Sequence, residues 1–383
     1  MDFSLTQEQN EIVALAKRFA DERIAPYYRQ RDEEGKFDRA TIREMGQLGF
    51  FGVEFPEESG GLGLDCLTAG LVLEALSGAD YNLAYVPVTI SLAGQMMRNH
   101  GKPEVVGPWL ERMLSGEAIP SVALTEPAGG SDAARLSLAA RREGDHYVLT
   151  GEKTSISMAT QSDVLVVFAR TGDAASGSRG VSAFVVPTDD PTITRTAFDD
   201  HGGRSATRGT LHFDGTRVPV DHMLGEENSG FSQVMAGFDY SRALIGLQSL
   251  AVARVSLDET WRYVGERQAF GKPIVEHQGV SFPLAEAETY YESARLLCLQ
   301  TLWLKDQGLA HTSQAAMAKW WAPKVAYDAV MACLLTHGHG GYSKDLPFEQ
   351  RLRDILGLHI GDGMAQIMKT IITRRRMAAI TRS

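Results

Sequence analysis

The chain has 383 residues, a formal net charge of −10 at pH 7 and 44% hydrophobic residues. This length suits two or three domains with sizeable cores, and the negative charge argues against nucleic acids and anionic membranes as partners. The three cysteines form no metal-spaced cluster, so neither a disulfide framework nor a zinc site is expected. Without a signal pattern or an apolar run of about 18 residues, we expect a cytoplasmic protein.

The first part of the chain, residues 1–119, is predicted to be a helical domain. A capped helix start at Thr6 precedes apolar residues at helical spacing. Residues 67–76 and 90–99 are further helical runs, and proline and glycine mark residues 55–63 as a loop.

The pattern changes in residues 120–227. The segments 147–150, 164–168 and 181–186 are short, apolar and rich in β-branched residues, and turn residues separate them. The small and polar stretch 172–180 is typical of a hairpin tip. We therefore predict a middle antiparallel β domain.

The last part of the chain, residues 228–383, returns to helical periodicity. Long periodic runs cover residues 252–267, 282–304, 312–336 and 364–381, which predicts a four-helix bundle. The fold class is therefore α+β, with a helical domain, a small β domain and a helical bundle in that order.

One stretch near the C-terminus, residues 354–367, places a carboxylate between two glycines. Asp362 lies between Gly361 and Gly363, just before an apolar helical run. Glycines let the backbone approach a ligand closely, and a carboxylate held there could act as a base. Asp before an apolar helical run is also a common N-cap, so both interpretations stand.

This stretch resembles the Ile-Tyr-Glu-Gly-Thr-x-x-Ile block of the acyl-CoA dehydrogenases, in which the Glu removes a proton from the acyl chain. Asp362 stands at the Glu position, Gly361 at the Tyr position and Met364 at the Thr position. The resemblance implies that Asp362 is the catalytic base. It also implies that Gly361 and Gly363 lie beside the substrate, and Met364 and Gln366 beside the cofactor FAD.

Two further blocks resemble the FAD-binding segments of this family. Residues 123–132 keep the Thr-Glu-Pro-x-x-Gly-Ser-Asp signature, although an ordinary Pro/Gly turn would look similar. Residues 151–157 are similar to Gly-x-Lys-x-Trp-Ile-Thr, with Ser155 in place of Trp and Ser157 in place of Thr; strand residues facing solvent are the alternative. The resemblance implies FAD contacts from Leu124, Thr125, Gly130, Ser131, Ser155 and Ser157, and a substrate contact from Ser131.

Residues 238–242 resemble the family's helix that meets the CoA chain, which implies substrate contacts from Asp239 and Arg242. Some members place their catalytic Glu just before this Arg, where this chain has Ser241. A base at either family position would therefore be Asp362. The alternative for Arg242 is an ordinary surface ion pair.

Residues 266–278 are similar to the family's Arg-x-x-Phe-Gly block, which reaches the FAD of a neighbouring subunit. This implies FAD contacts from Arg267, Phe270 and Gln278, and a guanidinium suits a pyrophosphate. The same residues are also typical of a helix C-terminus that stops at Gly271.

Residues 337–342 fall where the family has a Gly-Gly-x-Gly-Phe loop near the adenine, which implies an FAD contact from Gly338. His337 and His339 are closely spaced, but no carboxylate or cysteine completes a ligand set. We therefore predict no metal site.

The resemblance covers nearly the whole chain and implies FAD-dependent α,β-dehydrogenation of an acyl-CoA thioester. It also implies electron-transfer flavoprotein as the acceptor and a homo-oligomer, usually a tetramer. The short base Asp362, with Gly361 and Ser155 in place of large aromatics, suits a substrate that is bulky at its α carbon. Cyclohexanecarboxyl-CoA dehydrogenases are similar in this respect, so an alicyclic acyl-CoA is expected.

Three alternatives remain open. Nitroalkane oxidases share the fold and also use Asp as the base. Enzymes that form ring dienes use an Asp from a different loop, for which Asp80 is a candidate, although it also suits a loop cap. An inactive flavin-binding scaffold would explain why Asp362 and Met364 depart from the common pattern.

Overall fold

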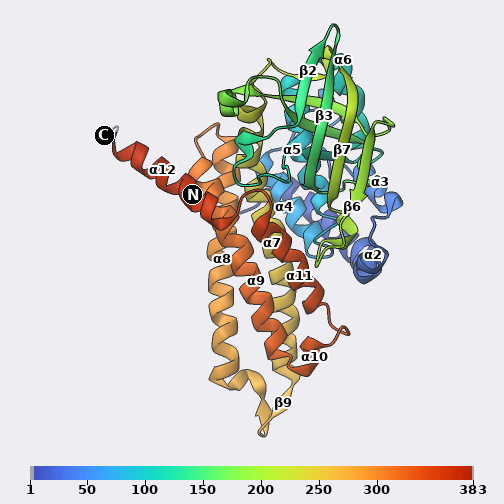
Figure 1. Ribbon diagram of the computed structural model, residues 1–383. Helices are drawn as coiled ribbons and strands as arrows, with labels where there is room; N and C mark the ends of the chain where they lie inside the picture. The colour runs from blue at the N-terminus through green and yellow to red at the C-terminus, as the bar shows by residue number, and fades with distance from the viewer. Residues whose placement is uncertain (1–3, 382–383) are drawn as a thin grey trace. The chain divides into compact units, whose positions relative to one another are not determined.

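The structure is a computed structural model that describes residues 4–381 (Figure 1). The chain divides into two compact units, each built from segments that are distant in sequence. The bundle unit contains the described residues of segments 1–30, 66–84 and 242–383, and the sheet unit contains residues 31–65 and 85–241.

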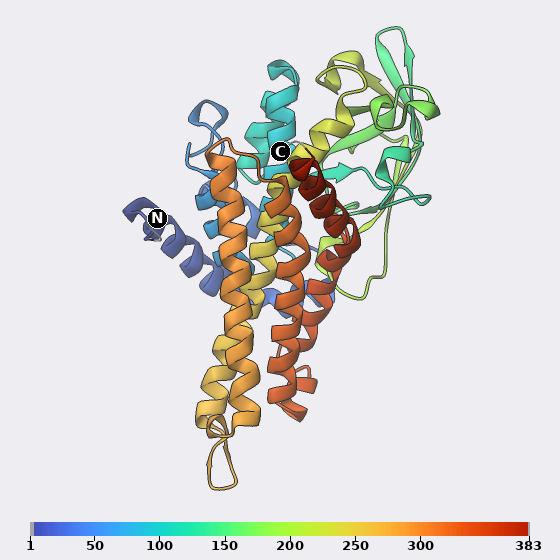
Figure 2. The same cartoon turned by 90° about the vertical axis from the view of Figure 1, so that its left-hand side faces the viewer.

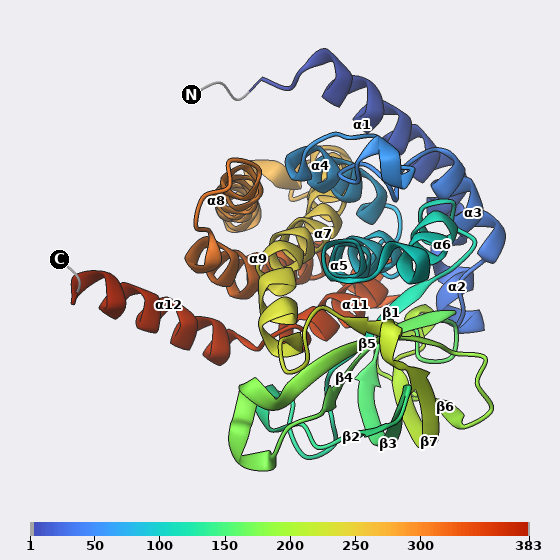
Figure 3. The ribbon, with the colours of Figure 1, turned by 90° about the horizontal axis from the view of Figure 1, so that it is seen from above.

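Long helices form the bundle unit. The C-terminal part of α7, together with α8, α9 and α11, runs side by side in Figure 2, and Figure 3 shows α7, α8 and α9 nearly end-on. The helices of this unit, with α7 and α2 continuing into the sheet unit, are α1 (Gln7–Phe19), α2 (Tyr28–Glu34), α4 (Cys66–Ser77), α7 (Gly230–Glu266), α8 (Gln278–Asp306), α9 (Thr312–Thr336), α10 (His339–Tyr342), α11 (Phe348–Ile360) and α12 (Ala365–Ile380).

Small residues let the bundle helices approach closely. A Cβ atom on Gly246 of α7 would lie 2.5 Å from Sγ of Cys298 on α8 and 3.3 Å from Cβ of Ala322 on α9. On α4, a Cβ atom on Gly70 would lie 2.4 Å from Cδ1 of Leu302 on α8. Any side chain at Gly246 or Gly70 would therefore force these helices apart or displace their neighbours.

The N-terminal helix begins as predicted. Oγ1 of Thr6 accepts a hydrogen bond from the backbone N–H of Gln9 at 3.1 Å, and Oε1 of Gln9 accepts one from the backbone N–H of Thr6 at 3.0 Å. This capping box satisfies two backbone donors that the helix itself cannot pair. Nε2 of Gln9 also donates to Oγ1 of Thr68 at 3.0 Å, which ties α1 to α4.

An eight-stranded sheet forms the centre of the sheet unit, in the order β6-β7-β3-β2-β4-β5-β8 with β1 beside β4. Most neighbouring pairs are antiparallel, as predicted, whereas β1 lies parallel to β4, with Pro120 opposite Val164. The strands are β1 (Pro120–Ala123), β2 (Ala139–Glu143), β3 (His146–Ile156), β4 (Val164–Arg170), β5 (Val181–Pro187), β6 (Ile193–Ala197), β7 (Gly209–Pro219) and β8 (Met223–Leu224). The helices of this unit are α3 (Arg39–Gln47), α5 (Tyr85–His100) and α6 (Pro103–Leu114).

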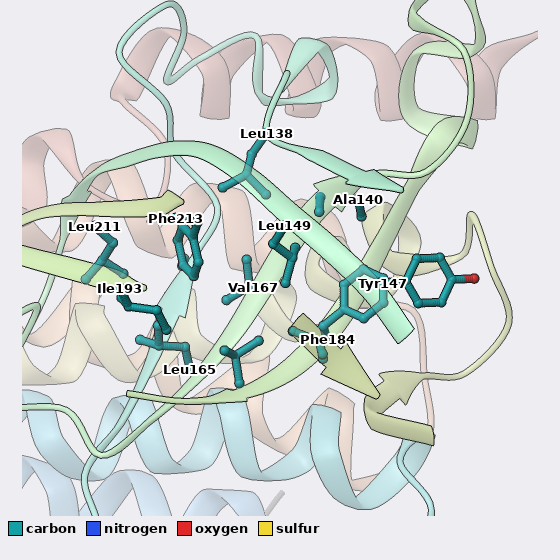
Figure 4. Packing of buried hydrophobic residues seen from close by; sticks show 14 of the residues in the cluster. Leu138, Ala140, Tyr147, Leu149, Leu165, Val167, Phe184, Ile193, Leu211 and Phe213 are labelled. Carbon is teal, nitrogen blue, oxygen red and sulfur yellow. The ribbon is translucent and has the colours of Figure 1, made fainter. Parts of the chain in front are cut away.

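The core of the sheet unit is apolar and tightly packed (Figure 4). The rings of Tyr147 and Phe184 lie 5.0 Å apart, and Leu149, Leu165 and Phe213 beside them are fully buried. Strands β4 and β5 are buried along almost their whole length, which explains why their sequences are continuous apolar runs. The predicted hairpin tip, residues 172–180, connects these two strands.

The helices α7 and α11 differ most from the sequence prediction. The helix expected over residues 252–267 begins much earlier, at Gly230, because glycines such as Gly237 hide the apolar periodicity of its first half. Helix α11 was not predicted, because buried polar residues such as Arg351 and Asp354 interrupt its apolar pattern. Within residues 4–381, every helix is too short or too polar to cross a bilayer.

Candidate active site

Asp362 lies in the short loop between α11 and α12. Its φ is +53°, a left-handed conformation that is uncommon outside glycine, and the next residue, Gly363, has a φ of +106°. The N-cap of α12 is Met364, and this position has no side-chain capping hydrogen bond. The N-cap interpretation of Asp362 is therefore wrong, and the carboxylate is left for another role.

Two cations from neighbouring helices hold the backbone of this loop. Nζ of Lys319 on α9 donates to the carbonyl oxygen of Leu358 at 2.6 Å and to that of Gly363 at 3.3 Å. Nε of Arg242 on α7 donates to the carbonyl oxygen of Asp362 at 3.5 Å. Both cations are buried, so the interpretation of Arg242 as a surface ion pair is wrong.

The surroundings of Asp362 set the acidity of its carboxyl group. Burial raises its pKa above the usual value, and the positive charges of Lys319 and Arg242 act in the opposite direction. Burial also lowers the pKa of Lys319 to about 8, against the attraction of Asp362. Burial therefore makes the Asp362 carboxylate a stronger base than a carboxylate in water, which suits a general base.

The sequence analysis did not identify Lys319. A signal was present, since this lysine lies in a helical run of small residues, between Ala315, Ala316, Ala318 and Ala322. A lysine surrounded by alanines in a buried helix has its ammonium taken up by a partner inside the protein.

In the sheet unit, a buried ion pair fixes the turn that follows β1. Lys153 of β3 is fully buried, and its Nζ donates to Oε1 of Glu126 at 2.7 Å and to the carbonyl oxygen of Leu124 at 3.0 Å. Glu126 also accepts hydrogen bonds from the backbone N–H groups of Ser137 and Leu138. Burial works to raise the pKa of Glu126, but Lys153 and these N–H donors outweigh it and hold the pKa below its usual value.

At this turn, the two sequence segments that were expected to bind FAD, residues 123–132 and 151–157, lie side by side. The backbone N–H of Thr154 donates to the carbonyl oxygen of Thr125 at 2.9 Å, so the end of β3 lies beside the turn. Gly130 and Ser131 are exposed in the turn, and the space around Gly130 is open. An exposed row of backbone and hydroxyl donors on a firmly held turn can bind an anionic or carbonyl-rich ligand.

Ser155, which replaces the family's Trp, has a left-handed backbone with a φ of +60°. Its side chain is exposed, and its Oγ accepts a hydrogen bond from Nη1 of Arg208 at 3.0 Å. Oγ of Ser121 donates to the carbonyl oxygen of Ser157, which is half-buried. The alternative interpretation, in which both serines face the solvent, therefore holds for Ser155 but not for Ser157.

One of the residues expected to reach a neighbouring subunit, Phe270, lies on a projecting hairpin of the bundle unit. Phe270 is 95% exposed at the tip of the hairpin formed by β9 (Gln268–Ala269) and β10 (Lys272–Pro273). The φ angles of Phe270 and Gly271 are +50° and +78°, which a tight hairpin turn requires. Helix α7 already ends at Glu266, so the interpretation of Gly271 as a helix stop is wrong.

The remaining candidates are dispersed. Arg267 precedes the hairpin and Gln278 begins α8, both exposed, and Gly338 is the N-cap of α10. Asp239 is half-buried on α7, whereas Met364 and Gln366 are exposed at the start of α12. The structure brings Asp362, Gly361, Gly363 and Arg242 together in the bundle unit, and Leu124, Thr125, Gly130, Ser131, Ser155 and Ser157 in the sheet unit.

Two alternatives from the sequence have structural roles. Oδ1 of Asp80 accepts hydrogen bonds from the backbone N–H groups of Asn82 and Leu83, so Asp80 caps its loop. His337 is buried, and its ring stacks on Tyr263 with centroids 4.2 Å apart. No cluster of three or more metal-binding side chains occurs among residues 4–381.

Comparison with known proteins gives a consistent result over the whole chain. Models of the N-terminal, middle and C-terminal domains of acyl-CoA dehydrogenase match residues 6–117, 121–216 and 228–377. A probable acyl-CoA dehydrogenase of Bacillus subtilis is 35% identical over 98% of this chain and 99% of its own length. Benzylmalonyl-CoA dehydrogenase of Aromatoleum aromaticum is 35% identical, with the same coverage of both chains.

Comparison with solved structures indicates the same family as the domain models do. The butyryl-CoA dehydrogenase of Megasphaera elsdenii has a TM-score of 0.95 and 30% identity, and the match covers 98% of this chain and 100% of that one. The chain belongs to the acyl-CoA dehydrogenase family. It is thus an oxidoreductase of a family whose members depend on FAD, and the expected fold is confirmed.

Proposed function

We propose that this enzyme removes hydrogen from the α and β carbons of an alicyclic acyl-CoA thioester, with Asp362 as the base that takes the α proton. The observation that carries this proposal is the half-buried carboxylate whose pKa burial has raised, in a loop held by two cations. A thioester carbonyl makes its α proton only weakly acidic, so the base must be stronger than a carboxylate in water.

The exposed donors on the turn after β1 support a role in binding FAD. Gly130 and Ser131 offer backbone and hydroxyl groups, and Ser157 directly follows the end of β3, which adjoins this turn. When bound, FAD supplies the acceptor for the hydride that leaves the β carbon. The buried pair of Glu126 and Lys153 holds the turn in the shape that this binding needs.

The substrate class follows from the length of the base. Asp is one methylene shorter than Glu, which withdraws the carboxylate by roughly 1.5 Å. A substrate with a ring at its α carbon brings its C–H closer to the base, and Gly361 and Ser155 leave room where aromatic side chains would narrow the site. We therefore expect a substrate such as cyclohexanecarboxyl-CoA.

We further propose that electron-transfer flavoprotein reoxidises the enzyme and that the working assembly is a homotetramer. The exposed ring of Phe270 on its projecting hairpin supports assembly, because moving an aromatic side chain from water into an interface lowers the free energy. Arg267 and Gln278, exposed near the same hairpin, would join the contact with FAD across subunits.

The test is an anaerobic titration of the FAD-loaded enzyme, with flavin absorbance as the signal. Cyclohexanecarboxyl-CoA should reduce the flavin faster than butyryl-CoA or octanoyl-CoA. Asp362→Asn should keep its FAD and its loop, because Asn tolerates the left-handed conformation, and should lose about 10²–10⁴-fold in rate.

Three other outcomes would each contradict one part of the proposal. Equal or faster reduction by the straight-chain esters would exclude the alicyclic preference. Reduction by a nitroalkane with no response to CoA esters would favour nitroalkane oxidation, and full activity in Asp362→Asn would show that Asp362 is not the base.

A further inference from the structure

The loop that carries Asp362 depends on contacts from outside its own two helices. Between α11 and α12 the chain turns through Gly361, Asp362 and Gly363, and the latter two have positive φ angles. A left-handed backbone is less favourable than a right-handed one for a residue with a Cβ atom, so neighbouring contacts help to hold Asp362 in this conformation. Lys319 provides two such contacts, one on each side of Asp362, at the carbonyl oxygens of Leu358 and Gly363.

The hydrogen bond to Leu358 also closes the end of α11. The last carbonyl groups of a helix have no partner within the helix, and Leu358 is among the last residues of α11. A buried carbonyl without a partner is costly, so an ammonium that fills this position fixes where the helix ends and the loop begins. Lys319 is itself only 1% exposed, which leaves its ammonium little freedom to move elsewhere.

The charges that face Asp362 come from two helices. Lys319 on α9 and Arg242 on α7 both favour its ionised form. On α11, Nε2 of His359 pairs with the carbonyl oxygen of Pro323, and burial lowers the pKa of this imidazole. On α12, the ammonium of Lys369 lies over the ring of Trp320.

We propose that Lys319 is the positioning residue of the catalytic base: its ammonium holds the loop through the carbonyl oxygens of Leu358 and Gly363 and contributes a positive charge to the surroundings of the Asp362 carboxylate. This rests on the proposed role of Asp362 as the base. The two contributions are separable, because a neutral amide retains donors for the carbonyl groups but carries no charge.

The experiment compares Lys319→Gln, which removes the charge, with Lys319→Met, which removes the charge and the donors, in the FAD-loaded enzyme. The reduction of flavin is followed by rapid mixing from pH 5 to 8, with whichever of cyclohexanecarboxyl-CoA, butyryl-CoA and octanoyl-CoA reduces the parent enzyme fastest. The rate falls at low pH as Asp362 takes up a proton. Without the cation the pKa of Asp362 rises, so this acidic limb should move to higher pH in both variants.

The rate of flavin reduction at the pH-independent plateau, above the acidic limb, reports how well the Asp362 carboxylate is positioned. Lys319→Met should lose about 100-fold, the effect of displacing a catalytic group by around 1 Å, and Lys319→Gln should lose less. Lys319→Arg, which keeps the charge, should keep the acidic limb near its original pH. The matched control is Lys324→Met, the same substitution at an exposed position on α9, where the lysine pairs with Asp328. This control should change neither the plateau rate nor the position of the acidic limb.

Thermal unfolding and FAD content are measured for every variant, and Lys319→Gln remains informative if Lys319→Met does not fold. An acidic limb that stays in place in Lys319→Gln would overturn the electrostatic role, and an unchanged plateau in Lys319→Met would overturn the positioning role. If Asp362→Asn is inactive while the Lys319 variants behave as the parent, only this inference fails. If Asp362→Asn is active, the proposed base is wrong.

Discussion

At the scale of single residues, Asp362 balances two requirements. Burial makes the carboxylate a stronger base by raising its pKa, whereas the positive charges of Lys319 and Arg242 act against this rise. The same two cations bind the backbone of the loop, so acidity and position are linked through the same side chains.

A longer acid at this position tests the substrate proposal. In Asp362→Glu the carboxylate reaches roughly 1.5 Å further, which suits a straight acyl chain better than a ring. We expect the ratio of flavin reduction rates, butyryl-CoA over cyclohexanecarboxyl-CoA, to rise. An unchanged ratio in a folded, FAD-loaded variant would contradict the argument from side-chain length.

The sequence revealed the candidate acid but not its conformation. A carboxylate between two glycines fits both an N-cap and a base, and only the positive φ of Asp362 and the place of Met364 as the N-cap separate them. Lys319 lies 43 positions before Asp362 along the chain, so their proximity depends on how α9 packs against α11 and α12.

At the scale of elements, a buried ion pair connects β3 to the turn after β1. Glu126 and Lys153 appear in two separate sequence motifs, 27 positions apart, and their pairing becomes visible only in the folded sheet. The strands themselves were predictable from short apolar segments, whereas the parallel pairing of β1 with β4 was not, because alternation along one strand does not identify its neighbour.

Removing one partner of this pair should be more harmful than removing both charges. Lys153→Met leaves the carboxylate of Glu126 buried without its cation, which costs about 3–5 kcal/mol. The double variant Glu126→Gln with Lys153→Met should regain part of that loss. Urea unfolding of the three proteins measures this, and equal stability of the single and double variants would contradict it.

At the scale of the whole molecule, neither compact unit is continuous in sequence. The expected helical domain, residues 1–119, contributes α1 and α4 to the bundle unit and α3, α5 and α6 to the sheet unit. Glu74 of α4 pairs with Arg295 of α8 at 2.7 Å, which fastens an early segment to a late one. Such long-range pairing cannot be read from local periodicity.

A fragment of residues 1–119 should therefore fail to fold by itself. It would expose the face of α4 around Gly70, which in the full chain packs on Leu302 and Leu247. We expect no cooperative thermal transition for the fragment by circular dichroism, with the full chain as the control. A sharp transition in the fragment would show that its helices form an independent core.

The left-handed backbone at position 362 also bears on how such an enzyme could have diverged. Asp tolerates this conformation better than Glu does, so an exchange of one acid for the other alters side-chain reach and loop strain together. A lineage that changed its acid would have needed compensating substitutions in the surrounding loop. The identity of the acid and the shape of its loop are therefore expected to be inherited together.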